Sequence, residues 1–254
     1  MLSVDKIHIL RDIASKKTGG LVVEKKLGDC IALIHKHNQI RFINQNESSS
    51  VEAIDVFNQE YTIEPFIPII GQQRFCSVIS GDAGNGKSLM GSLQIKQYIK
   101  LFPENKIYFV SQASYKDDPN LKDLPLNQLD SATIDENEIT NFKECLILFD
   151  DNDFSSDVKK VMNIVNKAVE VGRKLGLSII FITHINSKLN TSIIYRDFNM
   201  YTTFFSNLDN NRMLNVNLKI SKEIIEELKE KKPAYISFNK NYRTVITDTE
   251  IFKY

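Results

Sequence analysis

The chain of 254 residues lacks a net charge, because 32 lysine and arginine residues balance 32 aspartate and glutamate residues. A balanced chain exerts no strong long-range attraction on nucleic acid or on an anionic membrane, so we expect any contact with DNA to be local. The sequence also lacks an apolar run near the roughly 20 residues of a membrane span, and its first residues lack a small-residue cleavage site. These absences predict an intracellular protein with no membrane span.

Cysteine is scarce as well. Cys30, Cys76 and Cys145 are odd in number, far apart and set in apolar, strand-like runs. Such spacing excludes a disulfide framework and fits no pattern of metal ligands. It indicates buried free thiols in a reducing compartment.

The distribution of apolar residues divides the chain into two parts. Residues 1–65 are strand-like, with apolar runs on both sides of a short turn at 36–38, and predict a small β-rich N-terminal element. From residue 66 to residue 254, short apolar runs alternate with helical patterns, as in βαβ units with a parallel sheet. The predicted strands cover 75–80, 106–111, 145–149, 178–183 and 200–205, the predicted helices 87–101, 157–171 and 221–232, and a hairpin 234–248. The fold class is therefore α/β, with a parallel-dominated sheet flanked by helices and a C-terminal hairpin.

The segment GDAGNGKS fills every fixed position of the phosphate-binding pattern GxxxxGK[ST], between a predicted strand and a predicted helix. Its backbone N–H groups and the following helix N-terminus are suited to an anion, which predicts ATP as the ligand. Lys87 is expected to reach the β- and γ-phosphates and Ser88 to bind Mg²⁺. The predicted binding residues are Gly81, Asp82, Ala83, Gly84, Asn85, Gly86, Lys87 and Ser88. The alternative is a glycine-rich loop that binds no nucleotide.

Asp82 is unexpected in such a loop, because a carboxylate near phosphate is repelled unless it points away. An acidic pair follows the predicted strand 145–149. Asp150 is expected to position Mg²⁺, and Asp151 to orient or deprotonate the attacking water. The alternative for this pair is the start of a solvated acidic loop.

Polar residues also end the predicted strand 178–183. Strand tips at one edge of a parallel sheet converge, so Thr183 or His184 could sense the γ-phosphate or the lytic water. For His184, a hydrogen-bonded structural role stays open. Arg173, near the end of the preceding helix, is either an ordinary surface cation or a finger that reaches a neighbouring subunit's γ-phosphate.

The order GDAGNGKS, LILFDD and GRKLGLSIIFITH, with SQASYKDDPNL after the second strand, resembles the HerA/FtsK superfamily of DNA pumps. Within it, the chain is similar to the genome-packaging ATPases of poxviruses, giant viruses and virophages. The resemblance covers about residues 70–210. His184 departs from the glutamine that is common at this strand tip in the family, a difference that implies altered or pH-dependent sensing.

The resemblance implies a RecA-like core in which the sensor strand separates the two nucleotide-binding strands. It implies a homo-oligomeric ring, usually hexameric, that translocates double-stranded DNA into a viral capsid or at a membrane vertex. It also implies Arg173 as a finger acting in trans, and matches Arg212 loosely to an arginine of some cellular pumps. A viral factory in the host cytoplasm or the virion would be its place.

Three functions remain open from the sequence. The first is an ATP-hydrolysing packaging motor, for which DNA contacts at residues 187–190 and at the C-terminal lysines are candidates. The second is a related assembly or secretion ATPase that DNA does not stimulate. The third is a nucleotide-gated scaffold with little turnover.

Overall fold

The computed structural model describes residues 8–9, 29–36, 39–45, 62–65, 67, 74–150, 158–184, 197–208, 214, 218–241 and 243–254. The contacts of the chain group into two compact units, one of residues 69–199 and one of residues 1–68 with 200–254. The domain boundary expected between residues 65 and 66 remains a prediction. The unit of residues 69–199 holds the described residues of the predicted nucleotide site.

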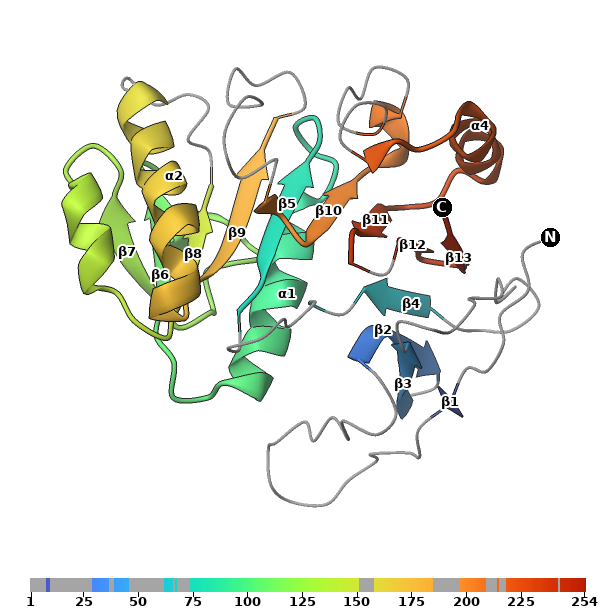
Figure 1. The fold of residues 1–254 in the computed structure, drawn as a ribbon, viewed down its shortest axis with the longest axis horizontal. Coiled ribbons are helices and arrows are strands. Elements are labelled where there is room, and N and C mark those ends of the chain that lie inside the picture. Colours follow the sequence, from blue (N-terminus) through green and yellow to red (C-terminus); the bar gives the residue numbers. More distant parts are fainter. Residues whose placement is uncertain are drawn as a thin grey trace. The chain divides into compact units, whose positions relative to one another are not determined.

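Five parallel strands form the sheet of this unit (Figure 1). Their order is β5 (Cys76–Ser80), β9 (Ser178–Thr183), β8 (Leu146–Phe149), β6 (Ile107–Ser111) and β7 (Leu126–Asp130). The residues of β5, β8 and β9 are all buried, as expected for central strands of a parallel sheet covered on both faces. The predicted α/β class is confirmed, and β9 lies between β5 and β8 as the resemblance implied.

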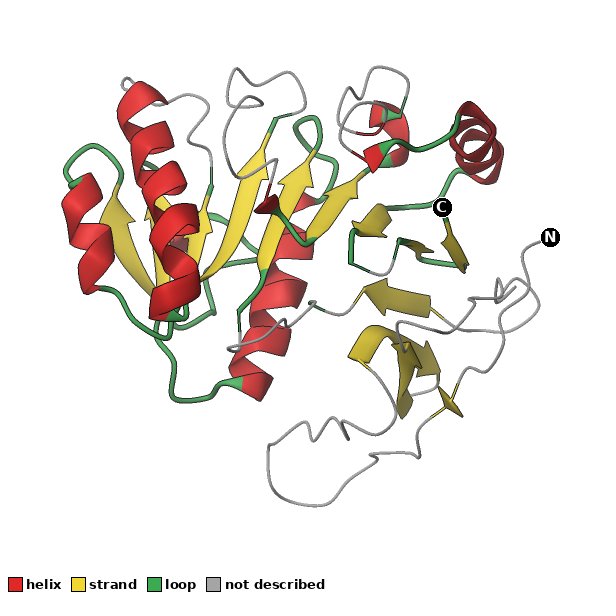
Figure 2. Ribbon diagram, in the orientation of Figure 1, coloured by secondary structure: helices red, strands yellow, loops and turns green. Residues whose placement is uncertain are grey.

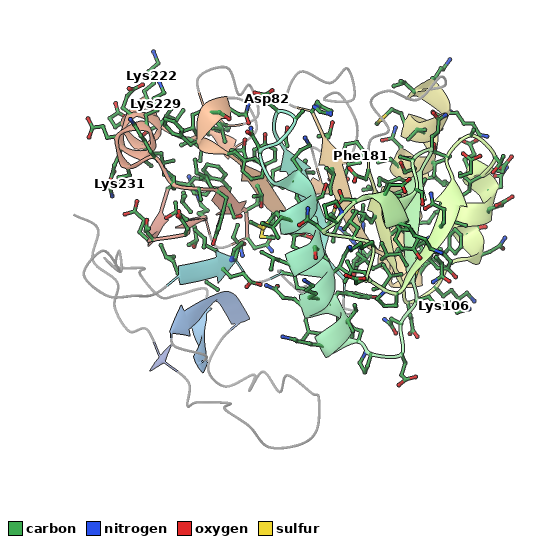
Figure 3. All side chains as sticks on the ribbon, turned by 180° about the vertical axis from the view of Figure 1, so that it is seen from behind. Asp82, Lys106, Phe181, Lys222, Lys229 and Lys231 are labelled. Carbon is green, nitrogen blue, oxygen red and sulfur yellow. The ribbon has the colours of Figure 1, made fainter. Side chains whose placement is uncertain are left out.

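Two helices cover opposite faces of the sheet: α2 (Val158–Leu175) lies in front of it in Figure 2, and α1 (Lys87–Leu101) lies in front of it in the view from behind in Figure 3. Helix α1 begins directly after the glycine-rich loop. Its Gly91 faces the sheet, where an added Cβ would lie 2.9 Å from Cδ1 of Ile182. Helix α2 buries one stripe at helical spacing: Val161, Ile164, Val165, Ala168, Val169 and Gly172. Short 3-10 turns, η2 (Tyr115–Asp117) and η3 (Glu136–Asn141), lie between β6 and β8 in the chain.

The other unit consists mainly of antiparallel strands. One sheet has the order β1 (His8–Ile9), β3 (Gln39–Gln45), β2 (Asp29–Lys36) and β4 (Thr62–Pro65). A second series runs β10 (Met200–Thr203), β11 (Ile236–Asn239), β12 (Thr244–Thr247) and β13 (Ile251–Lys253). The helix α4 (Lys222–Lys231) and the turn η6 (Phe205–Asn207) lie between β10 and β11 in the chain.

Both predicted hairpins are present, because β2 pairs with β3 and β11 pairs with β12 in antiparallel register. Among the described residues, no helix combines the length and the apolar character that crossing a membrane requires.

Candidate nucleotide-binding site

The ends of three adjacent strands bring the predicted site residues to one edge of the sheet. Ser80 of β5 pairs in register with Thr183 of β9, and Phe149 of β8 pairs with Phe181. Because the strands are parallel, the residues that follow them emerge at the same carboxyl edge. The glycine-rich loop, Asp150 and His184 therefore leave the sheet side by side.

The backbone of the loop 81–88 is arranged to receive an anion. Gly84 and Gly86 have φ angles of 81° and 90°, a left-handed conformation that glycine adopts without steric cost. Gly86 is the N-cap of α1, and no side chain caps the first turn of this helix. The first N–H groups of a helix have no intrahelical acceptor, so in this loop they remain available to phosphate oxygens.

Lys87 and Asp82 are joined across the loop. The ammonium group of Lys87, which is 9% exposed, donates a hydrogen bond of 3.0 Å to the backbone carbonyl of Asp82. The N–H of Asn85 donates to the same carbonyl at 3.4 Å. The bond keeps the lysine amine over the loop that it is predicted to serve.

Asp82 itself is exposed, at the loop that joins β5 to α1 (Figure 3). Water therefore screens its carboxylate, which weakens the repulsion that a phosphate group would feel from a buried aspartate. Ala83 and Gly84 are also exposed, and a Cβ added to Gly84 would meet no atom within 4 Å. The tip of the loop is thus open.

Ser88 and Asp150 are the described residues that could hold Mg²⁺. Ser88 lies half-buried in the first turn of α1, and Asp150 follows β8 with only 6% of its surface exposed. The N–H of Asp150 donates to the carbonyl of Val110 at 3.3 Å, which extends the alignment of β8 with β6. A hydroxyl and a carboxylate are oxygen ligands of the kind Mg²⁺ prefers, so this donor set fits the ion. Asp151, the predicted base, lies outside the described residues.

The end of β9 is hydrogen-bonded directly to the glycine-rich loop. The N–H of Gly81 donates to the carbonyl of Thr183 at 3.3 Å. The Thr183 hydroxyl is buried and donates to the carbonyl of His184 at 3.4 Å, while His184 is half-buried. The Gly81–Thr183 hydrogen bond therefore joins the two segments directly.

Arg173 lies at the opposite edge of the sheet. It is exposed in the last turn of α2, an 18-residue helix about 27 Å long that leads away from the carboxyl edge. The strand β9 that follows it starts beside the start of β5, because the N–H of Ile179 donates to the carbonyl of Phe75 at 2.9 Å. The five residues of β5 span about 16 Å, more than an arginine side chain can reach. The side chain of Arg173 therefore cannot reach the glycine-rich loop of its own chain.

One contact near Arg173 has no signal in the sequence. The guanidinium of Arg74 donates a hydrogen bond of 3.2 Å to the carbonyl of Val169 in α2, across a separation of 95 residues. Arg74 belongs to no motif, and only the folded sheet brings the start of β5 against the end of α2. Residues 187–190, which are predicted to contact DNA, lie outside the described residues. Arg212, which matches an arginine of some cellular pumps, also lies outside them.

The sequence matches no protein-family model. It is 29% identical over 175 residues to an uncharacterized protein of Sputnik virophage. The aligned region covers 65% of this chain and 70% of the virophage protein. Similar solved structures include the genome packaging NTPase B204 of Sulfolobus turreted icosahedral virus 2 with sulfate (TM-score 0.47, 14% identity, 71% of this chain and 96% of that chain). A DnaB-like replicative helicase is similar at a TM-score of 0.38 and 12% identity, over 69% of this chain and 52% of the helicase.

Proposed function

We propose that the chain hydrolyses ATP with Mg²⁺ as its cofactor. One observation carries this proposal: the glycine-rich loop, the carboxylate of Asp150 and the polar tip of β9 share one edge of a parallel sheet. The carboxyl edge of the strands is where nucleotides bind in open α/β sheets. The uncapped start of α1 supplies the phosphate-binding dipoles.

Each residue of the site has a separate task in this proposal. Lys87 leaves the Asp82 carbonyl and donates to the β- and γ-phosphates, while Ser88 and Asp150 hold the Mg²⁺. The bound ion supplies neutralisation of the phosphate charge. Asp151 orients or deprotonates the attacking water. Thr183 and His184 report the state of the γ-phosphate to the loop through the Gly81 hydrogen bond.

Arg173 acts in trans in this proposal, because its own phosphate loop is beyond its reach. Among the described residues, Arg173 forms no ion pair and no hydrogen bond through its side chain. An exposed guanidinium without an acidic partner is available to the γ-phosphate of a neighbouring chain. The active form is accordingly a homo-oligomeric ring, proposed to be a hexamer.

The energy of hydrolysis is proposed to move double-stranded DNA into a viral capsid. The motif order shared with the HerA/FtsK superfamily supports this assignment, and the virophage relative supports a viral setting. The proposed place is the viral factory or the virion, at the capsid or a membrane vertex.

Steady-state ATP hydrolysis with and without double-stranded DNA tests the proposal, with Lys87→Ala protein as the blank. The packaging motor predicts Mg²⁺-dependent turnover that rises with DNA. Turnover that ignores DNA would transfer the same site to an assembly or secretion ATPase. ATP binding without turnover in wild-type rings would instead favour a nucleotide-gated scaffold.

Mixed rings test the role of Arg173. Arg173→Ala chains should bind ATP and fail to hydrolyse it, whereas Lys87→Ala chains keep an intact finger. Mixing the two variants should restore part of the activity, because some sites then combine an intact loop with an intact arginine. Mixed rings that form and stay inactive would remove Arg173 from the shared site.

A further inference from the structure

Arg74 is hydrogen-bonded to a backbone carbonyl of α2 that also accepts the backbone N–H of Arg173. Its Nη2 atom donates a hydrogen bond of 3.2 Å to the carbonyl of Val169. Within the α-helix, this carbonyl is also the i−4 acceptor for the backbone N–H of Arg173. Two donors therefore meet at one oxygen, and one of them carries the proposed finger.

Gly172 makes room for this contact. A Cβ at position 172 would lie 3.2 Å from both Cζ and Nη2 of Arg74, and 3.3 Å from Cβ of Leu177. Such distances are shorter than ordinary van der Waals contacts, so any side chain at 172 would push the guanidinium away. The missing side chain of Gly172 thus leaves space for the Arg74 guanidinium beside the residue that carries the proposed finger.

The neighbouring hydrogen bonds fix the same turn of α2. The carbonyl of Gly172 accepts from the N–H of Leu177 at 2.9 Å, and that of Leu175 accepts from the N–H of Glu144 at 2.8 Å. Carbonyls in the last turn of a helix have no intrahelical donor and carry a partial negative charge. The cation of Arg74 adds a favourable interaction at this negative end.

The positive charges of Arg74 and Arg173 repel each other. The pKa of Arg74 lies below its usual value, first because of burial and also because of the nearby Arg173 charge, while Cys76 and Asp197 act in the other direction. An arginine remains protonated in spite of such a shift. Because Arg74 is held in place by Val169, the repulsion disfavours conformers of Arg173 that fold back over Arg74, and Arg173 is exposed.

We propose that Arg74 is a positioning residue for Arg173: it fixes the last turn of α2 through Val169 and keeps the Arg173 guanidinium directed outward, toward a neighbouring chain. This inference rests on the proposed function, in which Arg173 completes the site of the next subunit. It assigns Arg74 to the finger side of the shared site, although Arg74 itself contacts neither nucleotide nor reacting atoms.

Arg74→Gln is the variant to measure, since it removes the charge and retains an amide donor. We expect the dissociation constant for an ATP analogue to stay within about twofold and kcat to fall by about 10²-fold, as for other displacements of a catalytic group by about 1 Å. Arg74→Lys should recover part of the loss. Lys174→Gln is the matched control, because it removes an exposed cation from the same turn without a bond to Val169.

Mixed rings distinguish positioning from a general loss of structure. Arg74→Gln chains should regain activity when mixed with Lys87→Ala chains, and none when mixed with Arg173→Ala chains, because Arg74 and Arg173 would serve the same half of the site. Rescue by Arg173→Ala chains, failure of rescue by Lys87→Ala chains in rings that form, or a wild-type kcat for Arg74→Gln would each overturn the positioning role. Wild-type rings without any turnover would instead refute the proposed ATPase and, with it, the positioning role.

Discussion

The N–H of Gly81 donates a hydrogen bond of 3.3 Å to the carbonyl of Thr183, so the first residue of the glycine-rich loop is joined to the last residue of β9. The bond uses backbone atoms alone and survives a change of either side chain. The hydroxyl of Thr183 can therefore be removed while the link between loop and strand is retained.

Thr183→Val should lower kcat by about tenfold or more and leave the affinity for ATP analogues nearly unchanged, because valine keeps the shape of threonine and removes only its donor. Steady-state kinetics and a binding titration measure the two quantities. Thr140→Val, at an exposed threonine in η3, is the control and should leave both unchanged. Equal kinetics in the two variants would deprive the Thr183 hydroxyl of a catalytic role.

Lys87→Ala should strongly weaken nucleotide binding without unfolding the chain. The variant loses one hydrogen bond to the Asp82 carbonyl, a net stabilisation of about 1 kcal/mol, but it removes the cation that meets the phosphates. We expect the dissociation constant for ATP to rise about 100-fold or more and the midpoint of thermal unfolding to change by only a few degrees. Lys96→Ala, at an exposed lysine of the same helix, should retain wild-type affinity.

Gly91→Val should destabilise the unit of residues 69–199. The first added carbon would already lie 2.9 Å from Cδ1 of Ile182, and the two methyl groups of valine need further space against Ile79. Overpacking of this kind costs about 1–3 kcal/mol. Urea unfolding should show that loss. Lys96→Val carries the same β-branched side chain on the exposed face of α1, so a similar loss in both variants would point to helix propensity instead.

Cys145 should be unreactive in the native protein. Its thiol is buried, and burial raises its pKa to about 12 from an ordinary value of 9.0. Only the thiolate is nucleophilic, so alkylation at pH 8 followed by peptide mass analysis should label Cys145 only after denaturation. Labelling of the folded protein at the rate of a small free thiol would contradict this expectation.

The same shift predicts a dependence of stability on pH. Between about pH 9 and pH 12 the unfolded chain releases the Cys145 proton and the folded chain retains it. The free energy of unfolding should therefore fall with rising pH by up to about 1.4 kcal/mol per unit from this group. Cys145→Ala should have a shallower fall over that interval, and its slope relative to wild type measures the contribution.

The sequence predicts those elements of the fold that a short, local pattern of residues determines. The segments 76–80, 107–111, 146–149 and 178–183 are apolar and buried, and each was predicted as a strand. Helix α1 has the predicted bounds because the glycine-rich loop fixes its start. By contrast, β7 contains Asn127 and Gln128, is largely exposed at one end of the parallel series, and carries no alternation that predicts a strand.

The site divides in the same way. The loop 81–88 and Asp150 follow from motif and position, whereas the bond from Gly81 to Thr183 and the one from Arg74 to Val169 span 102 and 95 residues. Contacts at such separation depend on the strand order, which a single sequence does not encode in any short pattern. The side of the sheet on which Arg173 lies follows from that order too.

The place of β9 between β5 and β8 has a consequence for how the chain folds. Residues 178–183 pair with residues 76–80 on one side and with residues 146–149 on the other, yet they are the last of the five strands to be synthesised. Until residues 178–183 leave the ribosome, β5 and β8 have no strand between them, and the apolar edges that β9 will cover stay open. Closing loops of about a hundred residues is slow, so completion of this sheet should set the folding rate and expose the nascent chain to aggregation.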